Sequence, residues 1–250
     1  MRRNGNSGQV LLIAAFIMAS LLLSAQLYIL EVGKISADTN ENALNDFVFG
    51  VKLGSRNAII GSLANISNGG AEGILEQNLR EWAEFIGSQL LLGKNTMNFA
   101  MGETAPYSSG TWLSWGTNGY GVSSAYADFV HTLAGRETNV DMTYSVNVTT
   151  TLLIASVNQE LNETARQVDV TINILNEAHP ALAEQVTVYY RVSGTWLIPG
   201  FANGYRLQDY GNGTYVASFT AMASLIDAVS VLATDFRGIY VHANATSTEI

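Results

Sequence analysis

The chain has 250 residues and a net charge of −9, with charged side chains at 13% of positions and hydrophobic ones at 48%. This hydrophobic content excludes a disordered acidic chain, and 12 Lys and Arg residues are too few to form a basic surface for nucleic acid. The absence of cysteine excludes disulfides, thiolate metal sites and cysteine nucleophiles. The length allows one large domain or two small ones besides a membrane segment.

Residues 10–30 predict a transmembrane helix. They read VLLIAAFIMASLLLSAQLYIL and contain no charged side chain. At about 1.5 Å per residue this segment spans about 31 Å, which matches the hydrocarbon core of a bilayer. Arg2 and Arg3 precede it and several acidic residues follow it. The positive-inside rule therefore places residues 1–9 in the cytoplasm and the bulk of the chain outside, as a single-pass protein of the cell membrane.

The residues directly before the apolar segment favour a particular kind of signal. Ser7-Gly8-Gln9 resembles the processing site of archaeal class III signal sequences, which occur on type IV pilins and archaellins. The resemblance implies cleavage between Gly8 and Gln9, and a helix that stays with the mature protein and polymerises into a filament core. Two alternatives are a plain signal anchor and an ordinary cleaved signal peptide. For the ordinary signal peptide, Leu23 is too large at the outer position of the best cleavage site.

Small side chains within the apolar segment would allow such helices to pack closely, namely Ala15, Ala19, Ser20 and Ser24. Beyond the segment, apolar residues at mixed three- and four-residue spacing predict further helix over residues 31–66, and Asn65–Gly70 predicts a break. Residues 74–92 predict an amphipathic helix, with Leu75, Leu79, Trp82, Ile86 and Leu90 on one face.

Residues 94–122 predict an irregular region rich in aromatic side chains. We expect a candidate binding loop for sugar or a neighbouring subunit, formed by Tyr107, Trp112, Trp115 and Tyr120. The alternative is that the two tryptophans cover the core from a loop. The glycine-rich residues 116–121 predict a flexible loop, and residues 123–133 predict a short helix.

From Val140 onward the apolar pattern changes to period two, which predicts a long strand or two strands up to a break near residues 158–164. About seven short alternating strands follow, and they predict an all-β sandwich. The stretches Asp209–Phe219 and Val229–Asp235 resemble immunoglobulin-like modules of prokaryotic surface proteins. The expected fold class is therefore α+β, with an N-terminal transmembrane helix, a helical stalk and α+β region at 31–164, and an immunoglobulin-like sandwich at 165–246.

The sequence offers little catalytic or metal-binding chemistry. His131, His179 and His242 lie far apart, with no zinc-binding spacing. Asp128 and His131 could meet on a helix, but no G-x-S-x-G motif supplies a nucleophile. We predict no enzyme activity, metal or cofactor. The acidic and amide residues of the sandwich turns, Asp209, Asn212 and Asp235, are interpreted as turn residues rather than calcium ligands.

Five N-x-[ST] sequons lie in the part of the chain expected outside, at Asn65, Asn147, Asn162, Asn212 and Asn244. They permit N-glycosylation. The leading hypothesis is a membrane-anchored surface protein, a pilin-like subunit whose partners are the membrane and other such subunits. One alternative is a monomeric adhesin or solute-binding module that binds surface carbohydrate or protein. A second is an accessory subunit of an anchored hydrolase.

Overall fold

The computed structural model describes residues 44–89, 93–135 and 139–249. The chain divides into two compact units, residues 1–51 and 52–250, and both sheets belong to the second. The expected transmembrane segment 10–30, the processing residues Gly8 and Gln9, and the packing residues Ala15, Ala19, Ser20 and Ser24 lie outside the described residues. Within the described ranges, no helix has both the length and the apolar character needed to cross a bilayer.

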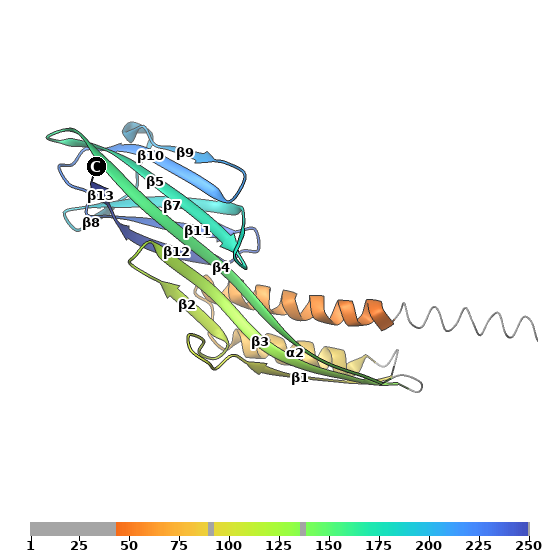
Figure 1. Cartoon of the computed structure of the whole chain (residues 1–250). Coiled ribbons are helices and arrows are strands. Elements are labelled where there is room, and N and C mark those ends of the chain that lie inside the picture. Colours follow the sequence, from red (N-terminus) through yellow and green to blue (C-terminus); the bar gives the residue numbers. More distant parts are fainter. Residues whose placement is uncertain (1–43, 90–92, 136–138, 250) are drawn as a thin grey trace, which may run out of the picture. The chain divides into compact units, whose positions relative to one another are not determined.

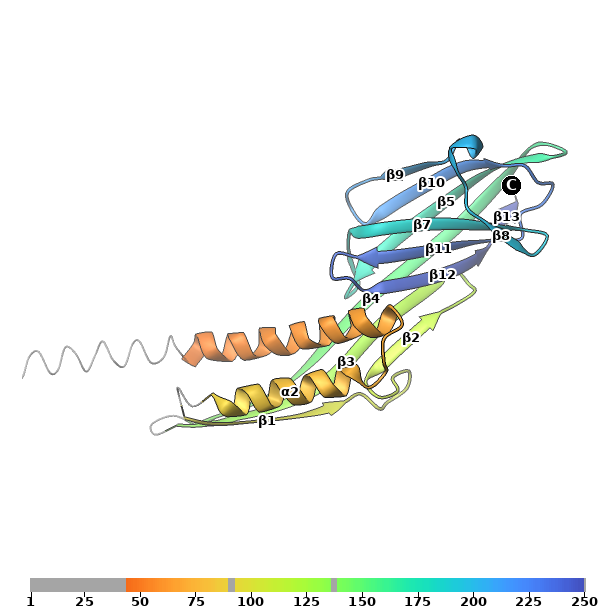
Figure 2. The same cartoon turned by 180° about the vertical axis from the view of Figure 1, so that it is seen from behind.

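Two helical segments of the second unit, residues 52–67 and α2, lie on one face of a long antiparallel sheet (Figures 1 and 2). The first belongs to a helix that covers residues 44–67, and α2 runs from Ile74 to Ser88. The helical expectations are confirmed for residues 44–66 and 74–88, whereas Gln89 is extended and ends α2 earlier than predicted. Gly54 lies so close to the Trp82 ring that an added Cβ would overlap it, so this glycine lets the two helices approach. Gly69, at φ +90°, turns the chain between them.

The sheet under the helices includes β1 (Lys94–Met101), β2 (Thr111–Trp115), β3 (Tyr120–Ala134) and β4 (Asn139–Asn162). The prediction of an irregular region over 94–122 is therefore wrong for β1 and β2, and the predicted helix over 123–133 is wrong. β3 pairs with β4 along its whole length and with β1 and β2 on its other edge. This pairing overrides the helix-like spacing of the apolar residues in this segment.

The expected long strand is confirmed as β4, which continues through the predicted break as far as Asn162. It pairs antiparallel with β5 (Ala165–Asn176), so the predicted boundary between residues 164 and 165 falls where the β4–β5 turn meets β5, within one sheet. The sheet order is β1-β3-β4-β5-β10-β9, with β10 at Thr214–Ala221 and β9 at Arg206–Asp209. The short β6 (His179–Pro180) pairs with β5, and β13 (Thr248–Glu249) runs parallel to β4.

A second sheet faces the β4-β5-β10-β9 part of the first and completes a C-terminal β-sandwich, which confirms the all-β expectation (Figure 1). Its order is β12-β11-β7-β8, over Tyr240–Thr246, Ala228–Asp235, Ala183–Val192 and Thr195–Leu197. A 3₁₀ turn, Phe201–Asn203, connects β8 to β9. The sandwich core is formed by buried apolar side chains from both sheets, including Ile172, Val188, Phe219, Val231 and Val241.

Candidate functional site

The glycine-rich residues 116–121 join the sandwich to the helix-covered sheet. The expected loop covers residues 116–119, and residues 120 and 121 already belong to β3. Gly119 donates its backbone N–H to Asn244 O at 2.8 Å, and Gly116 O accepts the N–H of Asn244 at 3.0 Å. An added Cβ would lie 2.3 Å from Ile154 O at Gly119 and 2.1 Å from His242 O at Gly121. These glycines let the β2–β3 hairpin seal the edge of β12, an edge that could otherwise pair with another chain.

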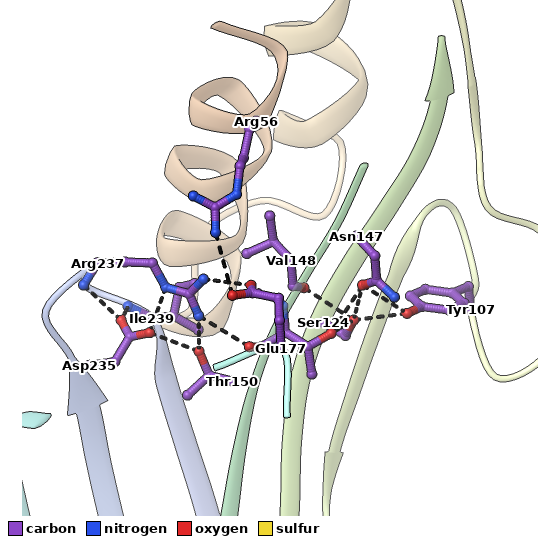
Figure 3. Close-up of polar contacts among 11 residues, drawn as sticks. Arg56, Tyr107, Ser124, Asn147, Val148, Thr150, Glu177, Asp235, Arg237 and Ile239 are labelled. Carbon is purple, nitrogen blue, oxygen red and sulfur yellow. Dashed lines mark hydrogen bonds and ion pairs between the residues drawn. The ribbon is translucent and has the colours of Figure 1, made fainter. Parts of the chain in front are cut away.

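A buried carboxylate organises the same junction (Figure 3). Asp235, at the end of β11, is fully buried and accepts the backbone N–H groups of Arg237 and Ile239 at 2.9 and 3.0 Å. Its second oxygen accepts Thr150 Oγ1 at 2.9 Å and forms an ion pair with Arg237 Nε at 2.8 Å. The carboxylate thus closes the β11–β12 turn and ties it to β4.

Glu177 extends this network toward the first helix. One carboxylate oxygen accepts Arg237 Nη1 at 2.6 Å and the backbone N–H of Thr149 at 3.1 Å. The other lies 3.4 Å from Arg56 Nη2, which reaches down from the helix in Figure 3. The junction network is therefore Arg56, Glu177, Thr150, Asp235 and Arg237. Four separate segments supply these residues. The two arginine charges are balanced by the two carboxylates, so the network is suited to holding the segments together.

The predicted aromatic binding residues divide into separate groups. The Tyr107 ring lies 6.2 Å from that of Trp112 and 5.7 Å from that of Tyr126. The Tyr107 hydroxyl hydrogen-bonds with Ser124 Oγ at 2.9 Å and donates to Asn147 Oδ1 at 3.3 Å (Figure 3). These side chains form a partly exposed aromatic and polar surface on the sheet, which we call the Tyr107 surface.

Trp115 and Tyr120 are placed elsewhere. Trp112 and Trp115 are three residues apart on β2, so strand alternation directs their side chains to opposite faces. The Trp115 ring lies edge-on to Tyr240 at 5.2 Å, and its Nε1 donates to Ser123 Oγ at 3.3 Å. Tyr120 stands opposite Leu153 on β4. The structure therefore brings Tyr107 together with Trp112, and leaves the other two aromatic residues outside the Tyr107 surface.

Asp128 and His131 cannot form a dyad, because β3 places them on opposite faces. Hydrogen bonds from Ser145 and Tyr126 lower the pKa of the Asp128 carboxyl. His131 is fully buried beside Asn95, 3.2 Å from its Oδ1, and burial lowers the pKa of the imidazole. His131 is thus a core residue of the helix-covered layer.

The other polar candidates also occupy structural positions. Asp209 accepts the N–H of Gly211 at 2.7 Å, and Asn212 accepts that of Thr214 at 3.1 Å, both in the β9–β10 turn. His242 Nε2 lies 2.7 Å from Ser230 Oγ and 3.0 Å from Asn244 Oδ1. Burial lowers the pKa of the His242 imidazole, and the bond with Asn244 opposes this shift. The described residues contain no group of three or more His, Asp or Glu suited to a metal ion.

Exposed apolar side chains at one end of the sandwich were not predicted from the sequence. Phe201 is 100% exposed and Met222 is 76% exposed, and Leu161, Ile198 and Leu225 are also exposed. Hydrogen bonds hold their segments at this end. Asn203 donates to Thr220 O, Gly194 N–H donates to Asp227, and Arg166 donates to Ser224 O. We call these five side chains the apolar end. The signal that sequence analysis could have used is the run Trp196–Phe201, which combines large apolar residues with Pro199 and Gly200.

Exposure separates the five sequons. Asn65, Asn147, Asn162 and Asn212 are exposed, whereas Asn244 is half-buried in β12.

No family model matches the chain, and no curated protein is significantly similar to it.

Proposed function

We propose that this protein is a membrane-anchored structural subunit of the cell surface, with its N-terminus in the cytoplasm and its sandwich outside. The uncharged segment 10–30 carries this proposal, because it has the length and composition of a transmembrane helix. The Ser7-Gly8-Gln9 sequence supports a pilin-like subunit that is processed before Gln9. Its apolar helices would then pack together through Ala15, Ala19, Ser20 and Ser24.

The helix-covered layer and the sandwich together are suited to a mechanical role. Helix residues Ile59, Leu63 and Ile66 are buried, and Arg56 of the same helix forms an ion pair with Glu177 beside the sandwich. Load arriving through this helix would pass to the sandwich through the junction network and the sealed edge of β12. The apolar end supports contact with another macromolecule, since exposed apolar patches mark interaction surfaces.

The sandwich is proposed to be immunoglobulin-like. In chain order, β4, β5, β9 and β10 correspond to strands A, B, D and E, and β7, β8, β11 and β12 to C, C′, F and G. The observed orders β4-β5-β10-β9 and β12-β11-β7-β8 then read A-B-E-D and G-F-C-C′. This is the arrangement typical of immunoglobulin sandwiches. The order supports the resemblance seen at Asp209–Phe219.

The N-terminus of the chain recovered from its native cells tests this proposal. Intact mass and N-terminal peptide mapping should give a start at Gln9, and shaving intact cells with protease should release sandwich peptides. Gly8→Val should block the cut, and Gly5→Val is the matched control that leaves it unchanged. A retained Met1 or Arg2 on an anchored, exterior chain would reject the pilin-like version. A sandwich protected in intact cells would reject the surface location as well.

A second candidate function is carbohydrate or protein binding by an anchored monomer, and the Tyr107 surface favours it. Aromatic rings beside hydroxyl and amide groups, as at Tyr107, Trp112 and Asn147, suit sugar recognition. Trp112→Ala should then abolish binding of intact cells to a glycan array, while Trp115→Ala should not, because Trp115 faces Tyr240. Equal binding by wild type and Trp112→Ala would reject this surface.

A further inference from the structure

The five sequons differ in whether a glycosyltransferase could reach both side chains that the sequon requires. The Asn amide must be exposed, and the hydroxyl two residues later must be accessible in the same backbone segment. A sequon in a surface loop meets this condition better than one within a paired strand or helix.

Asn162 meets it most fully. It is the last residue of β4, paired with Ala165 on the other side of the two-residue hairpin turn, and residues 160–164 are all exposed. Its Oδ1 accepts the Thr164 N–H at 2.9 Å and the Thr164 hydroxyl at 3.1 Å. These two hydrogen bonds stay within the sequon and use only the Asn162 amide oxygen, and the exposed side chain presents its amide nitrogen for glycosylation.

Two sequons are held within the fold. In the Asn65 sequon, Ser67 is 2% exposed, donates to Ala64 O and accepts the Tyr240 N–H. The half-buried Asn244 bonds His242 through its side chain, and its backbone pairs with Gly116 and Gly119 at the sealed β12 edge.

The remaining two are partly restrained. Asn147 is exposed but lies within the β3–β4 ladder, and its Thr149 hydroxyl bonds Ser124 at 2.6 Å. Asn212 is exposed in a turn, but its Thr214 lies in β10 and donates to Asn173 Oδ1 at 3.0 Å. The Asn162 hairpin is thus the best acceptor among the described sequons.

We propose that Asn162 carries an N-linked oligosaccharide, an inference that rests on the proposed exterior location. The donor would be an oligosaccharide on a polyisoprenyl phosphate or diphosphate. The amide nitrogen of Asn162 forms a bond with C1 of the first sugar as the bond from C1 to the phosphate oxygen breaks. The amide loses one proton, and the lipid-linked phosphate leaves with the electron pair.

The position of this glycan has a consequence for the apolar end. Arg166, the second residue of β5, donates to Ser224 O in the segment that carries Met222 and Leu225. Leu161 directly precedes Asn162. A glycan at Asn162 therefore adds a hydrated group beside exposed apolar side chains and would limit non-specific association there.

Tryptic peptide mapping of the full chain from its native cells tests the assignment. Cleavage after Lys and Arg places Asn65 in peptide 57–80, Asn212 in 207–237 and Asn244 in 238–250, while peptide 137–166 contains both Asn147 and Asn162. We expect a sugar mass on peptide 137–166, localised to Asn162 by fragmentation. Asn162→Gln and Thr164→Ala should remove it, and Thr164→Ser and Asn147→Gln should retain it.

The outcomes separate this inference from the proposed location. Unmodified peptide 137–166 on a chain that protease shaving shows to be exterior would overturn the Asn162 assignment alone. So would a sugar confined to Asn147 or Asn212. A chain protected from protease in intact cells and unmodified at all five sequons would overturn both.

Discussion

The helix-covered layer and the sandwich bury their sheets in different ways. The sandwich core is a continuous set of apolar side chains from two facing sheets. Under the helices, polar groups are buried among the apolar ones, including Ser55, Ser62, Asn95 and His131. The sandwich buries polar side chains too, including Asn158, Arg166 and Asp235, so hydrogen bonds contribute to both regions. Under the helices, these bonds join helices to a sheet, whereas the sandwich joins two sheets.

Ser55 illustrates the difference. Its hydroxyl accepts Trp82 Nε1 at 2.9 Å and bonds the Tyr144 hydroxyl at 2.8 Å, which links the two helices to β4. Tyr144 in turn stacks on Phe129, with ring centroids 5.1 Å apart. Such bonds fix the position of a helix along a sheet, whereas apolar contacts alone would tolerate sliding.

The largest expected effect is at the junction between the two regions. Asp235→Ala removes the carboxylate and leaves the Arg237 Nε and two backbone N–H groups without their acceptor. We expect a loss of about 3–5 kcal/mol in the free energy of unfolding, the cost typical of breaking a buried ion pair. Chemical unfolding of the full chain in detergent, followed by far-UV circular dichroism, measures it.

Asp209→Ala is the matched control, because Asp209 also accepts a turn N–H but is exposed. It should cost about 1 kcal/mol or less. Equal losses in the two variants would show that the junction network does not couple the regions.

The next effect tests the hydrogen-bonded core directly. Ser55→Ala nearly preserves volume but removes the acceptor of the Trp82 indole and a partner of Tyr144. We expect a loss of about 1–3 kcal/mol, because a buried donor is left unsatisfied. The same unfolding assay measures it, together with a change in tryptophan fluorescence. Ser88→Ala, on an exposed helical serine, should change stability by about 0.5 kcal/mol or less.

A pH dependence should arise from the helix-covered layer. Burial lowers the pKa of His131 below its ordinary 6.5, so the unfolded chain binds the proton more readily than the folded one. Stability should therefore be full above pH 6.5 and fall as the pH drops below that value. His131→Gln should show a smaller loss between pH 7.5 and 5 than wild type in thermal unfolding. An unchanged pH profile would contradict a neutral buried imidazole.

The sequence predicted those elements whose side-chain period matched their burial. α2 and β4 were predicted because their apolar residues follow a helical and a strand period along most of their length. β3 was missed because its inward-facing positions include Ala127 and His131, while the exposed Val130 completes a helix-like pattern. β3 is a strand because it pairs with β1 and β4, and the local spacing of apolar residues carries no information about that pairing.

The candidate site was harder to predict for a related reason. Asp235 and Arg237 are close in sequence, but Glu177, Thr150 and Arg56 reach them only through the topology. The four aromatic residues were grouped by sequence proximity, and the strand alternation of β2 separates them. Gly119 and Gly121 were interpreted as residues that make the backbone flexible. In the structure, their lack of a Cβ lets the backbone lie close to the carbonyl groups of Ile154 and His242.

The smallest expected effect lies on the solvent side of the helix-covered layer. Glu76 and Arg80 form an ion pair one helical turn apart on α2, and both side chains are largely exposed. Glu76→Gln should cost about 0.3–0.5 kcal/mol, and moderate salt should remove most of the difference. Gln77→Ala is the control on the same exposed turn, and its effect should not depend on salt. A salt-independent loss of several times this size for Glu76→Gln would mean that the polar contribution of this layer extends to its surface.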